Sequence, residues 1–310
     1  MGGGGGSSFS IKDYNEKSKD SQSRTDSGAF ESEINAMLNE KLKRYNDRDS
    51  LITNQHLEDI QSIIEEEFEG SIKMKFGGSV TKHTYVEGLS DIDILVLIND
   101  SKLSDYSPKS AIKLIKAHLD FKLKDVESIK EGKLAVTVRF SDGTEIQLLP
   151  ALMKGQGYHI PQRTGRDWSN LIRPDKFATK LTEVNQSLNG NVVRVVKLVK
   201  GKNSEFPNIQ QLSGYHIESL AIEIFKKYPP ELSKTPKAML KYFFQKGSEL
   251  VKTPIRDKTN QCLYVDDYLG KENSEKRMHA SHILTKIYKK IERADNGRSK
   301  IEWEEFIGEI

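Results

Sequence analysis

The spacing of apolar residues predicts strands mixed with helices in the first half of the chain and helices alone in the second half. Positions 72–76 alternate between apolar and polar residues, as in a half-buried strand, whereas 94–98 are continuously apolar, as in a strand at the centre of a sheet. The expected strands are 72–76, 91–98, 134–140 and 145–149, and the expected helices of this half are 34–45, 54–68 and 108–125.

Polar and turn-forming residues mark the expected ends of these strands. Asn99 and Asp100 are expected to end the second strand, and Pro150 the fourth. The segment 141–144 (Ser-Asp-Gly-Thr) lies between the third and fourth strands and is typical of a hairpin turn. The fourth strand is therefore expected to return beside the third.

After about Asp175 the apolar residues recur only at helical spacing, and no internal repeat is present. The expected helices are 192–199, 215–228, 239–250 and 279–293. The predicted fold class is α+β, with a mixed-sheet lobe packed on a C-terminal helical lobe and a cleft between them. We expect a flexible, polar tail over 1–28, the sheet lobe with an N-terminal helix over 29–173, and the helical lobe over 174–310.

Composition narrows the class of protein only modestly. The chain has 310 residues, of which 36% are hydrophobic and 30% charged, as in a soluble globular protein. No apolar run is long enough to cross a bilayer and no signal peptide is evident, so we expect a cytoplasmic protein without a membrane partner. Cys262 is the only cysteine, which excludes an intrachain disulfide and a cysteine-based zinc site. A net charge of +3 does not indicate nucleic-acid binding, which we do not expect.

Two aspartates open the most apolar strand. Asp91 and Asp93 are two residues apart, so in a strand their side chains point to the same face. Two adjacent carboxylates repel each other and raise each other's pKa, and a cation between them removes that repulsion. Hard oxygen ligands suit Mg²⁺, which takes its remaining ligands from water and substrate phosphates. The pair therefore predicts a magnesium site.

A glycine turn precedes this pair by about a dozen residues. Gly78 and Ser79 follow the first strand and are expected to open a helix. Glycine allows the backbone to approach a phosphate closely, and free N–H groups at a helix start attract anions. One end of the sheet would then bind a triphosphate beside a metal, which is what phosphoryl transfer requires. Neither motif is specific alone, but their order on strand, turn, helix and buried strand indicates a nucleotidyltransferase.

A third carboxylate usually completes a two-metal site. The candidate strand is 145–149, followed by Pro150 and Ala151. Glu145 and Gln147 share one face of this strand, and only Glu145 is acidic. Glu145 is therefore the predicted third metal ligand and catalytic carboxylate, beside Asp91 and Asp93.

These motifs resemble those of the polymerase β-like nucleotidyltransferases. Within that superfamily the chain is most similar to the CD-NTases, bacterial relatives of cyclic GMP-AMP synthase and oligoadenylate synthase. The similar segments are 76–79 (Phe-Gly-Gly-Ser), 90–96 (Ser-Asp-Ile-Asp-Ile-Leu-Val), 148–151 (Leu-Leu-Pro-Ala), 191–198, 212–218, 266–270 and 303–306. The resemblance covers roughly residues 30–310.

The resemblance implies an activity that composition and spacing do not show. CD-NTases use two Mg²⁺ ions, which Mn²⁺ can replace, to join nucleoside triphosphates into cyclic di- or trinucleotides with release of pyrophosphate. In bacteria these products activate effectors in CBASS anti-phage defence. The expected partners are nucleoside triphosphates, an effector that acts through the product, and a regulatory protein, all in a bacterial cytoplasm.

The resemblance also assigns roles to individual residues. Gly78 and Ser79 match the phosphate-binding turn, and Asp91 and Asp93 match the metal ligands. Lys197 matches a helical-lobe lysine that contacts the triphosphate, although it would also fit the edge of a core helix. Tyr215 matches an aromatic residue that stacks on a base, with ordinary core packing as the alternative.

Two positions depart from the family pattern. Gln147 occupies the place where many relatives carry the third carboxylate, three residues before the proline. Glu145 then serves as the third ligand with Gln147 contacting nucleotide, or the third ligand is weakened, or the chain is an inactive nucleotide-binding sensor. Gly214 replaces a phosphate-contacting serine, a role that Ser213 could take. A nucleotidyltransferase acting on another acceptor is a further alternative.

Overall fold

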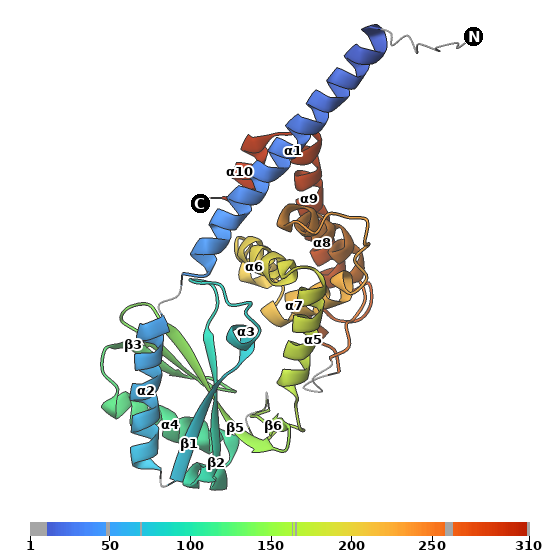
Figure 1. The fold of residues 1–310 in the computed structure, drawn as a ribbon. Helices are drawn as coiled ribbons and strands as arrows, with labels where there is room; N and C mark the ends of the chain where they lie inside the picture. Colours follow the sequence, from blue (N-terminus) through green and yellow to red (C-terminus); the bar gives the residue numbers. More distant parts are fainter. Residues whose placement is uncertain are drawn as a thin grey trace, which may run out of the picture.

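The structure, a computed structural model, describes residues 11–47, 50–68, 70–162, 164, 166–257 and 263–308. Cys262 lies outside these residues. Figure 1 shows two lobes, a sheet lobe and a helical lobe, with a long N-terminal helix that runs along the helical lobe and beyond it. The predicted α+β class, a mixed sheet followed by helices, is confirmed.

The sheet has the order β1-β2-β5-β4-β3, with β6 paired to the end of β5. Its strands are β1 (Gly70–Phe76), β2 (Ile92–Ser101), β3 (Val126–Glu131), β4 (Val136–Phe140), β5 (Glu145–Lys154) and β6 (Gly157–His159). Only β2 and β5 pair in parallel, so the sheet is mixed as expected. The four predicted strands are present, and the predicted hairpin joins β4 to β5. Sequence spacing missed β3 and β6, which are short and carry few apolar residues.

Two strands extend beyond their predicted ends. Asn99 and Asp100 do not stop β2, because β1 continues to pair with it as far as Ser101. Pro150 does not stop β5, which continues to Lys154. The ladder between β4 and β5 ends at Leu148, so the missing N–H of Pro150 takes no hydrogen bond from that ladder.

Two helices bury one face of this sheet. They are α2 (Ser50–Glu67) and α4 (Pro108–Lys122), and a 3-10 turn, η1 (Lys102–Asp105), precedes α4. Leu57, Ile60 and Ile64 of α2 pack with the apolar face of α4 and the inward residues of β2, β4 and β5. Ser107 caps α4 by accepting a hydrogen bond from the N–H of Ser110. The opposite face of the sheet points toward the helical lobe, and the candidate site lies on that face.

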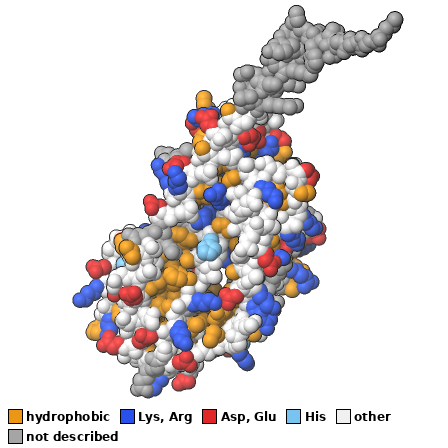
Figure 2. Space-filling model, in the orientation of Figure 1, with side chains coloured by type: hydrophobic (Ala, Val, Ile, Leu, Met, Phe, Trp, Pro, Cys, Tyr) orange, Lys and Arg blue, Asp and Glu red, His pale blue; other side chains and the backbone are white. Residues whose placement is uncertain are grey.

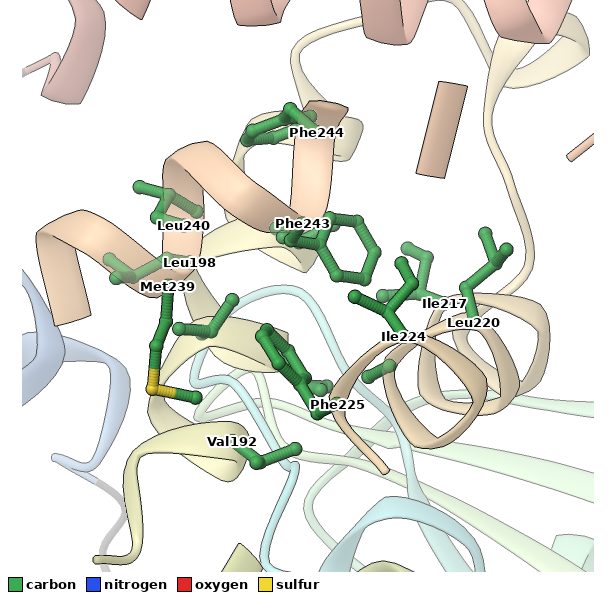
Figure 3. Close-up of a cluster of buried hydrophobic side chains, with 14 of the residues drawn as sticks. Val192, Leu198, Ile217, Leu220, Ile224, Phe225, Met239, Leu240, Phe243 and Phe244 are labelled. Carbon is green, nitrogen blue, oxygen red and sulfur yellow. The ribbon is translucent and has the colours of Figure 1, made fainter. Parts of the chain in front are cut away.

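The helical lobe packs six helices around one core. They are α5 (Pro174–Ser187), α6 (Asn191–Ser204), α7 (Gly214–Phe225), α8 (Pro236–Leu250), α9 (Glu275–Asn296) and α10 (Lys300–Ile307), with 3-10 turns η2 (Asn208–Gln210) and η3 (Asp267–Leu269). Figure 3 shows how Ile224 and Phe225 of α7 meet Phe243 of α8 and Val192 of α6. The four helices predicted from apolar spacing, now α6 to α9, are all present.

The N-terminal helix α1 (Ile11–Tyr45) differs from the prediction in two ways. Residues 11–28 are helical rather than an irregular tail. No proline interrupts this stretch, and the helix continues into a C-terminal part that is buried in the core of the helical lobe. In addition, Ile34, Leu38 and Leu42 lie in the core of the helical lobe, so α1 packs there and not on the sheet lobe, to which the predicted boundaries assigned it. Although α1 is long, no described helix is apolar enough to cross a membrane.

Candidate active site

A cleft of about 720 Å³ lies between the two lobes. One wall is the turn at α3 (Gly78–Thr81) with the start of β2, and the other is formed by α6, α7 and Tyr268. Figure 2 shows hydrophobic side chains gathered on the sheet lobe next to its junction with the helical lobe. The predicted cleft between sheet lobe and helical lobe is therefore present, and its two walls come from chain segments more than a hundred residues apart.

The glycine turn is built around the carboxylate of Asp93. Gly78 has a φ of +49°, and a Cβ there would lie 1.6 Å from Asp93 Oδ2, so only glycine fits. The backbone N–H of Ser79 donates to the Asp93 carboxylate, and the Gly77 N–H donates to the Asp93 carbonyl at 2.7 Å. Ser79 Oγ is buried, lines the cleft and has no hydrogen-bond partner among the described residues. A ligand oxygen in the cleft would give this hydroxyl the partner that a buried polar group needs.

The two aspartates and the candidate third ligand lie on adjacent strands. In the β2–β5 ladder Asp93 is opposite Gln147 and Ile92 is opposite Ile146, which places Glu145 beside Asp91. Gln147 Nε2 donates to Asp91 Oδ2, and the carboxyl of Glu145 is also in hydrogen-bond contact with Asp91. Four polar side chains thus share one face of the sheet where β2 begins.

This group concentrates negative charge in a partly buried place. Burial raises the pKa of Asp91 to about 6, and the neighbouring carboxylates of Glu145 and Asp93 add to the rise. Burial also raises the pKa of Asp93, against the opposing effect of the Lys82 ammonium and the Ser79 N–H. A bound cation would relieve both effects, so the donor set fits a hard divalent metal ion.

The third metal ligand is less complete than the sequence suggested. Glu145 is next to Asp91, but its carboxylate is also 3.7 Å from the guanidinium of Arg139. Gln147 has no charge and binds Asp91 directly. Across the described ranges, no three His, Cys, Asp or Glu side chains are arranged to hold one metal ion. Asp91 and Asp93 therefore form the core of the candidate metal site, and Glu145 lies at its edge.

The helical wall presents a buried ion-pair cluster that sequence reasoning missed. Glu218 of α7 is 1% exposed and pairs with Lys82, which follows the glycine turn, and with Lys200 of α6 at 2.8 Å. Thr84 donates to the same carboxylate, and Lys200 Nζ donates to the Thr84 carbonyl at 3.0 Å. Burial opposes ionisation of Glu218, but the two ammonium groups outweigh it and hold its pKa below the usual value. Lys82 and Lys200 line the cleft together with Gly78 and Ser79 of the glycine turn.

Lys197 lies outside the cleft, contrary to the role that the resemblance gave it. Its side chain is buried and its ammonium donates to Asn46, just after α1. Lys200, one helical turn further along α6, reaches the cleft instead. The sequence places Lys197 and Lys200 about one helical turn apart, but only the packing of α1 against α6 determines which of the two is buried.

Ser213, Gly214 and Tyr215 line the cleft at the start of α7. Ser213 caps this helix by accepting from the N–H of His216, and a Cβ at Gly214 would come within 3.4 Å of the Lys200 side chain. The Tyr215 ring lies 4.7 Å from the Phe177 ring, and its hydroxyl donates to Asp257 at 2.8 Å. Tyr215 thus has core contacts on one side and an open cleft on the other. Of the predicted nucleotide-binding residues, Gly78, Ser79, Ser213 and Tyr215 line the cleft, whereas Gln147 lies beside Asp91.

The mixed sheet and the helical lobe, with a cleft between them, form a two-lobed fold. No protein-family model matches the sequence, and no curated protein matches it significantly. Solved structures do match. The Bradyrhizobium diazoefficiens CD-NTase CdnG in complex with GTP aligns with a TM-score of 0.66 at 11% identity, over 88% of this chain and 96% of that one.

Two further structures show the same likeness. CdnC from E. coli MS115-1, in a complex with HORMA-deltaN, aligns with a TM-score of 0.62 at 15% identity, over 87% of this chain and 96% of that chain. The Vibrio cholerae DncV cyclic AMP-GMP synthase, in complex with the linear intermediate 5′ pppA(3′,5′)pG, aligns with a TM-score of 0.61 at 11% identity, over 96% and 89% of the two chains. The protein therefore has the CD-NTase fold, as the sequence motifs predicted.

Proposed function

We propose that this protein is a magnesium-dependent nucleotidyltransferase that joins nucleoside triphosphates into a cyclic di- or trinucleotide. The observation that carries the proposal is the cleft itself. It brings Asp91, Asp93 and the unpartnered Ser79 hydroxyl to face Lys200 and Tyr215 of the other lobe. The cleft thereby surrounds one space with carboxylates for a metal, hydrogen-bond donors for phosphates and an aromatic ring for a base.

The chemistry follows from these positions. A ribose hydroxyl of one nucleotide forms a bond to the α-phosphorus of another, the bond from that phosphorus to the bridging oxygen breaks, and pyrophosphate leaves. Mg²⁺ held by Asp91 and Asp93, with Glu145 at the edge, would supply charge neutralisation at the transferring phosphate. The Ser79 hydroxyl binds a phosphate oxygen, and Lys200 balances the charge of the leaving pyrophosphate. The proton of the attacking hydroxyl passes to the carboxylate of Glu145.

The comparisons support the substrate class. The structural neighbours include a CD-NTase bound to GTP and a cyclic AMP-GMP synthase bound to a linear dinucleotide intermediate. Another is in a complex with a HORMA protein, which supports a regulatory protein as a partner for this chain too. We place the activity in CBASS-type anti-phage defence in a bacterial cytoplasm, with the product acting on an effector.

The test is incubation of the purified chain with four labelled nucleoside triphosphates and Mg²⁺ or Mn²⁺, then phosphatase treatment and chromatography. A phosphatase-resistant product and released pyrophosphate are expected. Asp91→Asn and Asp93→Asn should each lower synthesis at least about 100-fold, since each removes a metal ligand. Asp100→Asn is the matched control, because Asp100 is an exposed aspartate at the other end of the same strand. Full synthesis by the Asp91 or Asp93 variant would refute the proposed site.

A second candidate function is a nucleotide-binding sensor without catalysis. The observation that favours it is the incomplete third ligand, with Gln147 in the ladder position opposite Asp93 and Glu145 shared with Arg139. Binding of nucleoside triphosphate without pyrophosphate release, under several divalent metals and with candidate protein activators present, would support the sensor. Product formation only after addition of an acceptor macromolecule or small molecule would instead indicate a nucleotidyltransferase of another kind.

A further inference from the structure

An ion pair lies in the cleft away from the carboxylates of Asp91 and Asp93. Lys75 Nζ of β1 donates to the hydroxyl of Tyr158 at 2.8 Å and to the two carboxylate oxygens of Asp175 at 3.1 and 3.2 Å. Tyr158 is 5% exposed and therefore holds the lysine in place. The side chains of Lys75 and Asp175 are 39% and 49% exposed, and both line the cleft. An ammonium and a carboxylate are thus presented side by side to a ligand.

The sheet between this pair and the aspartates is apolar. Lys75 is opposite Leu95 in the β1–β2 ladder, and Leu95 follows Asp93 by two residues on the same face. The backbone of Lys75 is therefore about 7 Å farther along the strands than that of Asp93. Leu95 and Leu149 line the intervening part of the cleft, with Ile172 nearby. A flat, apolar floor of this length suits a nucleobase whose ribose lies at the aspartates.

We propose that Lys75 and Asp175 select guanine in the nucleotide that supplies the attacking hydroxyl. This inference rests on the proposed function. Guanine presents its N1–H and its 2-amino group side by side, next to the O6 acceptor, so the two carboxylate oxygens of Asp175 accept the two donors while Lys75 donates to O6. Adenine and cytosine each present one amino group on that edge, and uracil presents one N–H between two carbonyls, so none of them matches both oxygens.

The pair has the capacity for this contact. Lys75 Nζ lies 3.2 and 3.1 Å from the two oxygens of Asp175, where the two guanine donors would bind, so the ammonium turns toward O6 as the base enters. It keeps its hydrogen bond to Tyr158 in doing so, because an ammonium has three donors on a flexible carbon chain. An ion pair this exposed contributes little to folding stability. Replacement of either residue is therefore expected to leave the fold intact and to change nucleotide selection.

The experiment compares binding of non-hydrolysable analogues of GTP, ITP and ATP to the full chain with Mg²⁺. Inosine lacks only the 2-amino group of guanine, so the wild-type protein should bind the GTP analogue about tenfold more tightly than the ITP analogue. Asp175→Asn should reduce that ratio to near one, and Lys75→Met should weaken binding of both, because both carry O6. Lys116 and Asp120 form the matched control, an exposed pair on α4 outside the cleft; Asp120→Asn should leave the ratio unchanged.

The outcomes separate this inference from the proposed function. Equal wild-type affinity for the GTP and ITP analogues, or a ratio that Asp175→Asn does not change, overturns guanine selection even where a cyclic product forms. Equal weakening of all three analogues together with a lowered melting temperature also overturns it, since the pair then only joins the lobes. A ratio that depends on Asp175, in a protein that releases no pyrophosphate, supports base recognition while the proposed catalysis fails.

Discussion

The carboxyl group of Asp91 destabilises the folded protein when no metal ion is bound. This group is partly buried next to the carboxyls of Glu145 and Asp93, and its pKa is raised to about 6. A charge arrangement that destabilises the metal-free protein is typical of a functional site, because the ligand supplies the missing partner. Two experiments at this scale separate function from folding.

The first prediction concerns pH. In the folded state Asp91 takes up a proton near pH 6, whereas the unfolded chain does so near its ordinary value of 3.8. Between these pH values the folded state therefore binds more protons than the unfolded state. The Asp91 carboxyl destabilises the metal-free fold fully above about pH 6, and this destabilisation disappears as the pH falls toward 3.8. Asp91→Asn should melt at a higher temperature than the wild type at about pH 7.5 without metal, and the difference should shrink by about pH 5.

Thermal melting across this pH range, with and without Mg²⁺, measures the effect. Mg²⁺ should raise the melting temperature of the wild type at about pH 7.5 and much less so that of Asp91→Asn, because metal binding needs the deprotonated carboxylate. A variant that melts below the wild type at neutral pH would contradict the assigned electrostatics.

The second prediction decides the third ligand. If Glu145 completes the metal site, Glu145→Gln should lower product formation at least about 100-fold, whereas Glu127→Gln should have little effect. Glu127 is the matched control because it also pairs with Arg139 but on an exposed part of β3. Gln147→Asp places a carboxylate opposite Asp93 and should preserve or raise activity. Loss of activity in Gln147→Asp alone, with Glu145→Gln active, would show that the glutamine itself contacts substrate.

At the scale of elements, the short helix α3 matters less than the turn before it. The sequence predicts a helix start as the phosphate site, but α3 has four residues and offers little dipole. The candidate site depends instead on the Ser79 hydroxyl, which has no hydrogen-bond partner among the described residues, and on the close contact between Gly78 and Asp93. The turn and strand β2 are therefore one structural unit.

The third prediction tests that unit. Gly78→Ala should abolish activity and destabilise the protein by about 2–4 kcal/mol, because the new Cβ meets Asp93 Oδ2 in a left-handed backbone position. Gly88→Ala is the control: Gly88 also has a positive φ, of +74°, but a Cβ there meets nothing within 4 Å. It should cost only about 1 kcal/mol in urea unfolding and keep activity. Equal costs for the two variants would show that the contact with Asp93 is unimportant.

At the scale of the whole molecule, Glu218 joins the lobes. Its carboxylate binds Lys82 of the sheet lobe and Lys200 of the helical lobe, and all three side chains are nearly buried. These two lysines also line the cleft, so the same charges that hold the lobes together face the substrate. The junction of the lobes and the site are therefore coupled.

The fourth prediction follows from this coupling. Glu218→Gln should lower the free energy of unfolding by about 3–5 kcal/mol, because it leaves two buried ammonium groups without their carboxylate. Glu223→Gln on the same helix is the control; Glu223 pairs with Lys226 near the surface and should cost at most about 1 kcal/mol. Urea unfolding of both variants measures the difference. A cost below about 1 kcal/mol for Glu218→Gln would contradict the role of this ion-pair cluster.

Local pattern was enough to predict strands β1, β2, β4 and β5, most helices and the central motifs. Apolar alternation reports which residues face a core, and glycine or paired aspartates on a strand have few structural uses, so Gly78, Ser79, Asp91 and Asp93 were found by sequence alone. Glu145 was placed beside Asp91 by the same period of two, although whether it serves as a ligand stays a prediction. These features depend on neighbours a few residues away.

Only the tertiary structure decided which distant side chains meet. Lys197 and Lys200 look alike in the sequence, but the packing of α1 covers Lys197 and leaves Lys200 in the cleft. Three further features likewise join segments far apart along the chain: the packing of α1 on the helical lobe, the cluster around Glu218, and the pair of Lys75 with Asp175. The sequence by itself determined most of the elements and the pairing of Asp91 with Asp93 on one strand face, because those follow from local periodicity. The opposite wall of the site was decided by the packing of the two lobes, which no local pattern encodes.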